Sequence, residues 1–197
     1  MADPTTFYST LFTLLFVGMW VAWFVVWRVM ALRAKAAARS ESLSSRLSHV
    51  VPLVIAAGLL AAPRIPFPVL GDRFVPLALW VAWLGAALMF AGLLLCVWAR
   101  LVIAENWSSA VQVKHGHELV VDGPYRWVRH PIYTGLLLMF AGTALAVDEW
   151  RGVLAVAIAA GAFWRKLSIE ENAMRGEFGD AYERYAGRTR ALIPFVL

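Results

Sequence analysis

Between Gly123 and Gly135 the chain gathers side chains that could bind an anion or move a proton. Arg126, Arg129 and His130 crowd cationic or ionisable groups into a short polar stretch between two long apolar segments. Pro131 disfavours a helical conformation at the preceding residue and suits the first turn of a helix, so a helix is predicted to begin there. A helix N-terminus offers free backbone donors. The stretch is therefore a candidate site at the edge of an apolar region.

Tyr133 follows His130 by three residues and is expected on the same helical face. The pair Glu170-Glu171 is the second candidate. Adjacent helical residues do not share a face, so one acid could point inward while the other faces Lys166 or Arg175, four residues away. An acid pair beside an apolar span is a site candidate by default. The alternatives are a structural histidine, an interfacial tyrosine and a solvated acidic helix face.

The composition is that of a membrane protein. Hydrophobic residues make up 61% of the 197 residues and charged residues only 16%, with ten Trp available for lipid–water interfaces. The net charge of +5 sits beside apolar segments, which favours a topology signal over nucleic-acid binding. The single cysteine, Cys96, lies within an apolar span and is not expected to be catalytic. His115 and His117 have no companion at ligand spacing, so no metal is expected.

Five apolar segments are predicted to span the membrane: 7–32, 49–62, 75–99, 131–147 and 152–164. The short polar turn 148–151 makes the last two an antiparallel helical hairpin. Gly85 and Gly92 should allow another helix to approach the third span closely. The tail from Arg165 is amphipathic and is predicted to form one or two interfacial helices that fold back on the membrane face. The sequence thus predicts an all-α membrane protein, with one domain over residues 1–197.

Charge predicts the orientation of this domain. All but three of the 18 Lys and Arg residues fall on one side of the predicted spans, and only Arg64, Arg73 and Arg151 lie on the other. The positive-inside rule then places the N-terminus outside, with five crossings and a cytoplasmic C-terminus. The polar segments 100–130 and 165–197 would both face the cytoplasm. Residues 1–99 would form N-terminal spans, and residues 100–197 the functional core.

These polar segments carry a family resemblance. The motifs are Gln112, His117-Glu-Leu119-Val120, Gly123-Pro-Tyr125, Arg129-His130-Pro131-Ile-Tyr133-Thr-Gly135, Glu170-Glu171, Phe178-Gly179-x-x-Tyr182-x-x-Tyr185 and Ile193-Pro194-Phe195. In this order, joined by a hairpin, they resemble the isoprenylcysteine carboxyl methyltransferase family over about residues 100–197. The resemblance implies a multispan methyltransferase that uses S-adenosyl-L-methionine without a Rossmann domain. Its acceptor would be lipophilic or prenylated and would enter from the membrane lipids.

The resemblance also implies roles for individual residues. Those expected to line the cofactor pocket are Gln112, Val113, His117, Leu119, Tyr125, His130, Tyr133, Glu170 and Glu171. Arg129 and Arg188 match arginines of the family and could hold an acceptor carboxylate, and with the two glutamates they form the expected catalytic set. Lys166 stands where the family often has Arg, and Lys cannot grip a carboxylate with the same two-pronged geometry. This departure weakens the case for a carboxylate held at that position.

Three other functions remain open from the sequence. A phospholipid or amine N-methyltransferase would keep the cofactor and use Glu170 or Glu171 as a base. A membrane sterol-type reductase that uses NADPH shares a similar Arg-His-Pro-x-Tyr-x-Gly stretch, but it often has Asn where this chain has Ile132. A membrane scaffold without activity would leave the clustering of Arg, His, Tyr and Glu unexplained.

Overall fold

The computed structural model describes residues 4–32, 42–62, 67–103 and 119–193. Its elements are α1 (Pro4–Ala31), α2 (Leu43–Ala61), α3 (Leu79–Ile103), the 3-10 helix η2 (Gly123–Arg126), α4 (Pro131–Val147), α5 (Trp150–Phe178) and α6 (Asp180–Ala186). Within these residues the regular structure is entirely helical, which confirms the predicted all-α class. Three of the predicted pocket residues, Gln112, Val113 and His117, lie outside the described residues.

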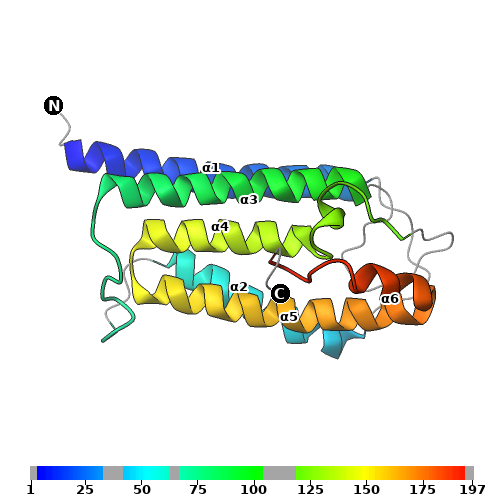
Figure 1. Ribbon diagram of the computed structural model, residues 1–197. Coiled ribbons are helices and arrows are strands. Elements are labelled where there is room, and N and C mark those ends of the chain that lie inside the picture. The colour runs from blue at the N-terminus through cyan, green and yellow to red at the C-terminus, as the bar shows by residue number, and fades with distance from the viewer. Residues whose placement is uncertain (1–3, 33–41, 63–66, 104–118, 194–197) are drawn as a thin grey trace.

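Helix α4 is the centre of the bundle. It packs against α3 on one side and α5 on the other, while α1 lies along α3 and α2 along α5 (Figure 1). Four helical segments are long and apolar enough to cross a membrane: Thr10–Ala31, Leu43–Ala61, Leu79–Ile103 and Trp150–Phe178. At 17 residues α4 is shorter, and it would extend roughly 25 Å at the usual helical rise. The chain is an integral membrane protein, and the fifth crossing remains a prediction.

Glycines allow α3 and α4 to approach each other closely, as expected for Gly85 and Gly92. A Cβ atom built on Gly85 would lie 2.6 Å from the carbonyl oxygen of Gly142, and one on Gly92 would collide with the carbonyl of Gly135. Because the lipid tails are as apolar as the helices, close backbone packing of this kind is a main source of helix association in membranes. The contact fixes the position of α4 relative to α3.

The hairpin between α4 and α5 forms as predicted, with a tight turn at one end of the bundle. Asp148 adopts a left-handed conformation, with φ of 56°, and its N–H caps α4 on the carbonyl of Ala144. Arg151 then donates from Nε to Glu149 at 2.7 Å, and from Nη1 to the carbonyls of Leu59 at 2.7 Å and Ala62 at 2.6 Å. This buried arginine therefore ties the hairpin to the end of α2.

Helix α5 is longer than the sequence suggested. The predicted span ended at Trp164, with separate interfacial helices after it, but α5 continues without a break to Phe178. The pairs Lys166–Glu170 and Glu171–Arg175 have i,i+4 spacing and support the extra turns. Gly179, with φ of 47°, then ends α5, and α6 folds back. The acid pair therefore stands on the polar end of a helix that begins at the other end of the bundle.

The chain after α6 returns to the start of α4. The N–H groups of Arg129 and His130 donate to the carbonyls of Arg190 at 2.7 Å and Ala191 at 3.0 Å. The hydroxyl of Thr134 donates to the carbonyl of Leu192 at 2.6 Å. This return places the loop before α4, the polar end of α5 and the tail at one end of the bundle (Figure 1).

Candidate active site

The start of α4 directs His130 toward α5. His130 is the N-cap residue of α4, but its side chain makes no capping hydrogen bond, and Pro131 supplies the first helical residue. The imidazole lies between the two adjacent acids: Nε2 is 3.3 Å from Oε1 of Glu171, and Nδ1 is 3.5 Å from Oε2 of Glu170. Neighbouring residues on a helix point in different directions, and so do the two nitrogens of an imidazole. Glu170 and Glu171 can therefore both contact the ring of His130, one at each nitrogen.

This arrangement favours the protonated imidazole. Burial by itself lowers the pKa of His130, but the hydrogen bonds and negative charges of Glu170 and Glu171 outweigh it and raise the pKa above its ordinary value of 6.5. A protonated imidazole donates from both nitrogens, whereas a neutral one donates from only one. The two carboxylates therefore favour the form of His130 that can donate a hydrogen bond to each of them.

Arg129 connects three segments of the site. Its Nε donates to Oε1 of Glu171 at 2.8 Å, and its Nη1 donates to the carbonyls of Ala186 at 3.2 Å and Thr189 at 2.7 Å. Arg129 stands just before α4, so its guanidinium links the start of α4 to the polar end of α5, through Glu171, and to the end of α6 and the turn after it, through Ala186 and Thr189. Hydrogen bonds between charged groups in a buried setting are the stronger ones, so this link should hold the tail in place.

Tyr133 extends the cluster along α4. Its hydroxyl donates to Oε1 of Glu170 at 2.5 Å. Its ring stacks between His130 and Phe163, with centroid distances of 5.5 and 5.1 Å, and Nζ of Lys166 lies 5.6 Å from the ring centroid. The hydroxyl thus contacts Glu170 and the ring contacts His130, so Tyr133 belongs to the charged cluster.

Cations on α5 complete the charge balance. Nζ of Lys166 lies 3.9 Å from Glu170, and Nη2 of Arg175 lies 3.2 Å from Oε2 of Glu171. The two carboxylates thus face more than one cation each, which stabilises their ionised form in this poorly solvated position. The solvated-face alternative does not hold for Glu171, whose side chain is only 8% exposed.

Tyrosines form the wall behind the cluster. Tyr125 is buried and its hydroxyl is 3.4 Å from the carbonyl of Ala99 on α3, while Tyr185 donates to the carbonyl of Tyr125 at 2.8 Å. Burial raises the pKa of Tyr182 to about 12 and also raises that of Tyr185. These phenols stay neutral near pH 7. The sequence marked Tyr182 and Tyr185 only as motif and amphipathic positions, and the hydrogen bond from Tyr185 to the loop is a feature of the fold.

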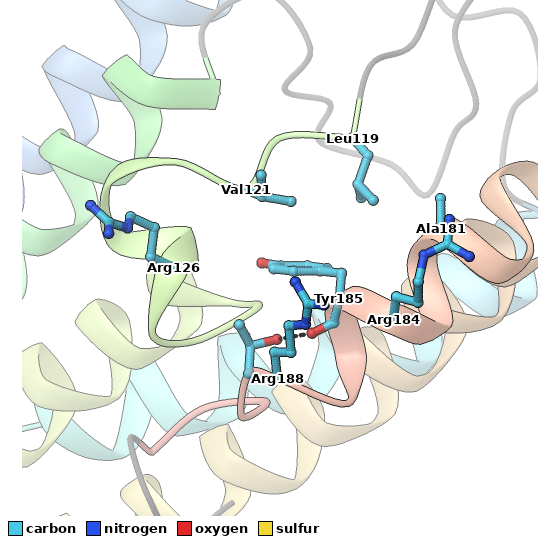
Figure 2. Close-up of a pocket in the computed structure, with 8 residues that line it drawn as sticks. Leu119, Val121, Arg126, Ala181, Arg184, Tyr185 and Arg188 are labelled. Atoms are coloured by element: carbon cyan, nitrogen blue, oxygen red, sulfur yellow. Dashed lines mark hydrogen bonds between the residues drawn. The ribbon is translucent and has the colours of Figure 1, made fainter.

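A pocket of about 570 Å³ adjoins the cluster. Leu119, Tyr185, Arg188 and Thr189 help to line it, and Thr189 also accepts the hydrogen bond from Arg129 through its carbonyl. Figure 2 shows Leu119 and Val121 on one wall, with Tyr185 and Arg188 across from them. The acid cluster and the pocket therefore share the turn after α6 as a common wall.

The structure brings together most of the predicted residues that it describes. Arg129, His130, Tyr133, Glu170 and Glu171 form one connected cluster. Leu119 and Arg188 lie instead in the adjoining pocket, and Tyr125 packs behind it. Thr189 was missed, because its contribution is a backbone carbonyl, for which side-chain chemistry gives no signal.

Together, the fold and the site define an integral membrane protein with a charged, partly buried site at one end of its helical bundle. A family model described as phospholipid methyltransferase matches residues 80–181, slightly more than half of the chain. The chain therefore belongs to the phospholipid methyltransferase family.

Individual relatives confirm the resemblance to the isoprenylcysteine carboxyl methyltransferases. The chain is 27% identical over 120 residues to protein-S-isoprenylcysteine O-methyltransferase B of Arabidopsis thaliana, which covers 59% of this chain and 61% of that protein. It is 32% identical over 101 residues to protein-S-isoprenylcysteine O-methyltransferase of Schizosaccharomyces pombe, covering 50% and 43%. The chain thus spans less than two thirds of the length of these relatives.

A solved structure supports the same relationship at the level of the fold. The structure of a eukaryotic intramembrane Ras methyltransferase, an isoprenylcysteine carboxyl methyltransferase, superposes with a TM-score of 0.56 and 25% sequence identity. The match covers 78% of this chain and 52% of the other. The fold of most of this chain is therefore similar to that of a membrane methyltransferase.

Proposed function

We propose that this protein is an S-adenosyl-L-methionine-dependent methyltransferase that acts on a lipophilic acceptor, with carboxyl O-methylation of an isoprenylcysteine-like group as the reaction. The observation that carries the proposal is the convergence of His130 and Tyr133 from α4 with Glu170 and Glu171 from α5. Family membership and the methyltransferase relatives support it. By the positive-inside rule, the site would face the cytoplasm, where the cofactor is made.

The donor set suits this cofactor, whose ammonium and sulfonium groups are cationic. Among the described residues, Oε2 of Glu171 accepts only from Arg175, whose side chain is 42% exposed. A carboxylate can accept several hydrogen bonds, so Glu171 keeps capacity for an ammonium group. Because both faces of the Tyr133 ring are covered, by His130 and Phe163, an aromatic base would stack on the other face of the His130 ring. Leu119 and Tyr125 would complete the pocket, with Gln112, Val113 and His117 contributing from the preceding segment.

Of the two arginines proposed for the acceptor, Arg188 is better placed than Arg129. Arg129 already donates to Glu171 and to two carbonyls, which makes it a positioning residue for the tail. Arg188 is exposed and lines the pocket next to Thr189. We therefore assign Arg188 to the acceptor carboxylate, which a guanidinium can bind with two parallel hydrogen bonds. The roles of Glu170 and Glu171 lie on the cofactor side.

The bound cofactor would supply an electrophilic methyl group. A carboxylate acceptor is ionised at neutral pH, so the protein needs no general base. Its tasks are to align the acceptor oxygen with that methyl group and to exclude water. Arg129 would help to align the acceptor by holding the turn that carries Arg188. The tail would help to exclude water, because Thr134 and the backbone N–H groups of Arg129 and His130 hold it against α4.

Amine N-methylation is the second candidate, because the matching family model is described as phospholipid methyltransferase. That reaction requires a base for the amine. Glu170 and Glu171 are each engaged by cationic donors here, which makes them weaker proton acceptors. The ion pairs therefore favour the carboxylate acceptor.

The test is incubation of the purified full chain with methyl-labelled S-adenosyl-L-methionine and either a prenylated cysteine or a lipid extract. The proposal expects label in the organic phase that base treatment releases as methanol, since methyl esters hydrolyse. Label that resists base treatment would instead support N-methylation. Absence of both transfer and cofactor binding would contradict the proposal.

A further inference from the structure

The two carboxylate oxygens of Glu171 are held in unequal ways. Oε1 accepts a hydrogen bond from Nε of Arg129 at 2.8 Å and lies 3.3 Å from Nε2 of His130. The side chains of these two partners are only 13% and 10% exposed. Among the described residues, the donor to Oε2 is Nη2 of Arg175 alone, at 3.2 Å, and that side chain is 42% exposed. Two buried partners therefore fix one oxygen of the carboxylate, and a half-exposed one holds the other.

Arg175 has other partners besides Glu171. Its Nε donates to Oε1 of Glu183 at 3.0 Å, and its Nη1 donates to Oδ1 of Asn172 at 3.4 Å. Its guanidinium carbon also lies 5.8 Å from the ring centroid of Tyr182. Tyr182 and Glu183 belong to α6, which folds back at the polar end of α5 (Figure 1). Because none of these contacts uses Nη2, the guanidinium can leave Oε2 of Glu171 and keep partners on α6.

The contacts of Glu171 also differ in how easily they break. Removing a partner from the buried pair with Arg129 leaves an uncompensated charge in a poorly solvated place. The pair with Arg175 has i,i+4 spacing on one helix and a half-exposed cation, so water screens it and solvates the cation once it is released. A second cation at Oε2 would be repelled by all three neighbours of the carboxylate. Arg175 is the neighbour that can move away, because it alone is half-exposed.

We propose that Arg175 stands in for the ammonium group of a nucleoside ligand at Oε2 of Glu171, and that it leaves this oxygen when such a ligand binds. This inference rests on the proposed function, which places the ammonium group of S-adenosyl-L-methionine at Glu171. In the empty site, Arg175 would satisfy a poorly solvated carboxylate oxygen. Any ligand that uses this oxygen must first displace the guanidinium, which lowers its affinity. The demethylated product carries the same ammonium group, so Arg175 would also ease product release.

This exchange predicts a gain of affinity, which a purely structural role for Arg175 would not produce. Arg175→Gln removes the competing cation, so a ligand with an ammonium group should bind more tightly. Arg175→Lys keeps a cation four residues from Glu171 and should retain the wild-type affinity. The matched control is Arg165→Gln, which removes the same charge from another exposed position on α5, where Nε donates to Ser48.

The measurement is calorimetric titration of the full chain in detergent with two probes. Decarboxylated S-adenosyl-L-homocysteine carries the ammonium group without a carboxylate, and methylthioadenosine carries neither group. Arg175→Gln should bind the amine probe about threefold more tightly than the wild type does, as expected for the loss of one partly exposed ion pair. Its affinity for methylthioadenosine should not change. Arg175→Lys and Arg165→Gln should match the wild type with both probes.

The two probes also separate this inference from the proposed function. If the wild type binds neither probe, the cofactor assignment fails and the role of Arg175 fails with it. If the wild type binds both, unchanged or weaker binding of the amine probe by Arg175→Gln overturns the role of Arg175 alone. Equal tightening in Arg175→Lys or Arg165→Gln would overturn it too. So would any change of methylthioadenosine affinity in Arg175→Gln that equals the change for the amine probe.

Discussion

Nε of Arg129 donates to Oε1 of Glu171 at 2.8 Å, across 42 residues of sequence. The same carboxylate oxygen lies 3.3 Å from Nε2 of His130. One acid therefore connects two successive residues at the start of α4 with the polar end of α5. Because the Nη1 atom of Arg129 also holds the turn after α6, the tail depends on this link. The predictions below start from it.

Glu171→Gln should lower both stability and cofactor affinity. The substitution leaves Arg129 without its anionic partner and leaves His130 with Glu170 alone, and breaking a buried pair from one side costs about 3–5 kcal/mol. Thermal unfolding and calorimetric titration of S-adenosyl-L-methionine on the folded fraction measure the two effects. Glu183→Gln is the control, since among the described residues Glu183 pairs with exposed Arg175 alone and its side chain is 59% exposed. Unchanged affinity in Glu171→Gln would remove Glu171 from the cofactor pocket.

His130 should make stability depend on pH. Its pKa is raised above 6.5 in the folded state, so its contribution is fully present below pH 6.5 and is lost as pH rises through the folded-state value. With other groups held equal, the wild type should therefore lose thermal stability as the pH rises above 6.5. His130→Asn should flatten this slope. An identical slope in the variant would show that another group titrates.

His130→Ala should also weaken binding of S-adenosyl-L-methionine. The substitution removes the bridge between Glu170 and Glu171 and the ring that stacks on Tyr133. Calorimetric titration near pH 6, where the wild-type imidazole is protonated, gives the clearest comparison. If His130→Ala and Glu171→Gln both bind the cofactor as the wild type does, the proposed pocket is misplaced.

Tyr133→Phe should separate the hydroxyl of Tyr133 from its ring. Phe keeps the stack on His130 and Phe163 but loses the hydrogen bond to Glu170. We expect a loss of about 1 kcal/mol in stability, together with slower methyl transfer. Tyr133→Leu should do more, because it also removes the stack. Kinetics at saturating cofactor that match the wild type in Tyr133→Phe would contradict a role for the hydroxyl.

Gly135→Ala should destabilise the bundle without touching the site. A Cβ atom at Gly135 would lie 2.6 Å from Sγ of Cys96 and 2.6 Å from the carbonyl of Gly92. Overpacking of this kind costs about 1–3 kcal/mol. Gly161→Ala is the matched control, since nothing lies within 4 Å of its added Cβ, and Ala favours the helix. A melting temperature of Gly135→Ala equal to that of the control would argue against the close contact of α3 and α4.

The sequence by itself determined the features that depend on local composition. Apolar length marks the spans, Pro131 marks the start of α4, and the polar turn before Arg151 marks the hairpin. Gly85 and Gly92 indicated a close helix contact, and the motif residues indicated the family. Each of these follows from spacing or backbone preference within a short stretch, which a sequence displays directly.

Only the tertiary structure decided how the charges are paired. The sequence left Glu170 and Glu171 as alternatives, whereas the structure places one on each nitrogen of His130. Arg129 and Arg188 looked equivalent until Arg129 was found bound to Glu171 and two carbonyls. The extension of α5 past Trp164 was also missed, because its polar turns are stabilised by contacts with α4 and the tail. Such pairings join residues far apart along the chain, and their geometry exists only once the helices have packed.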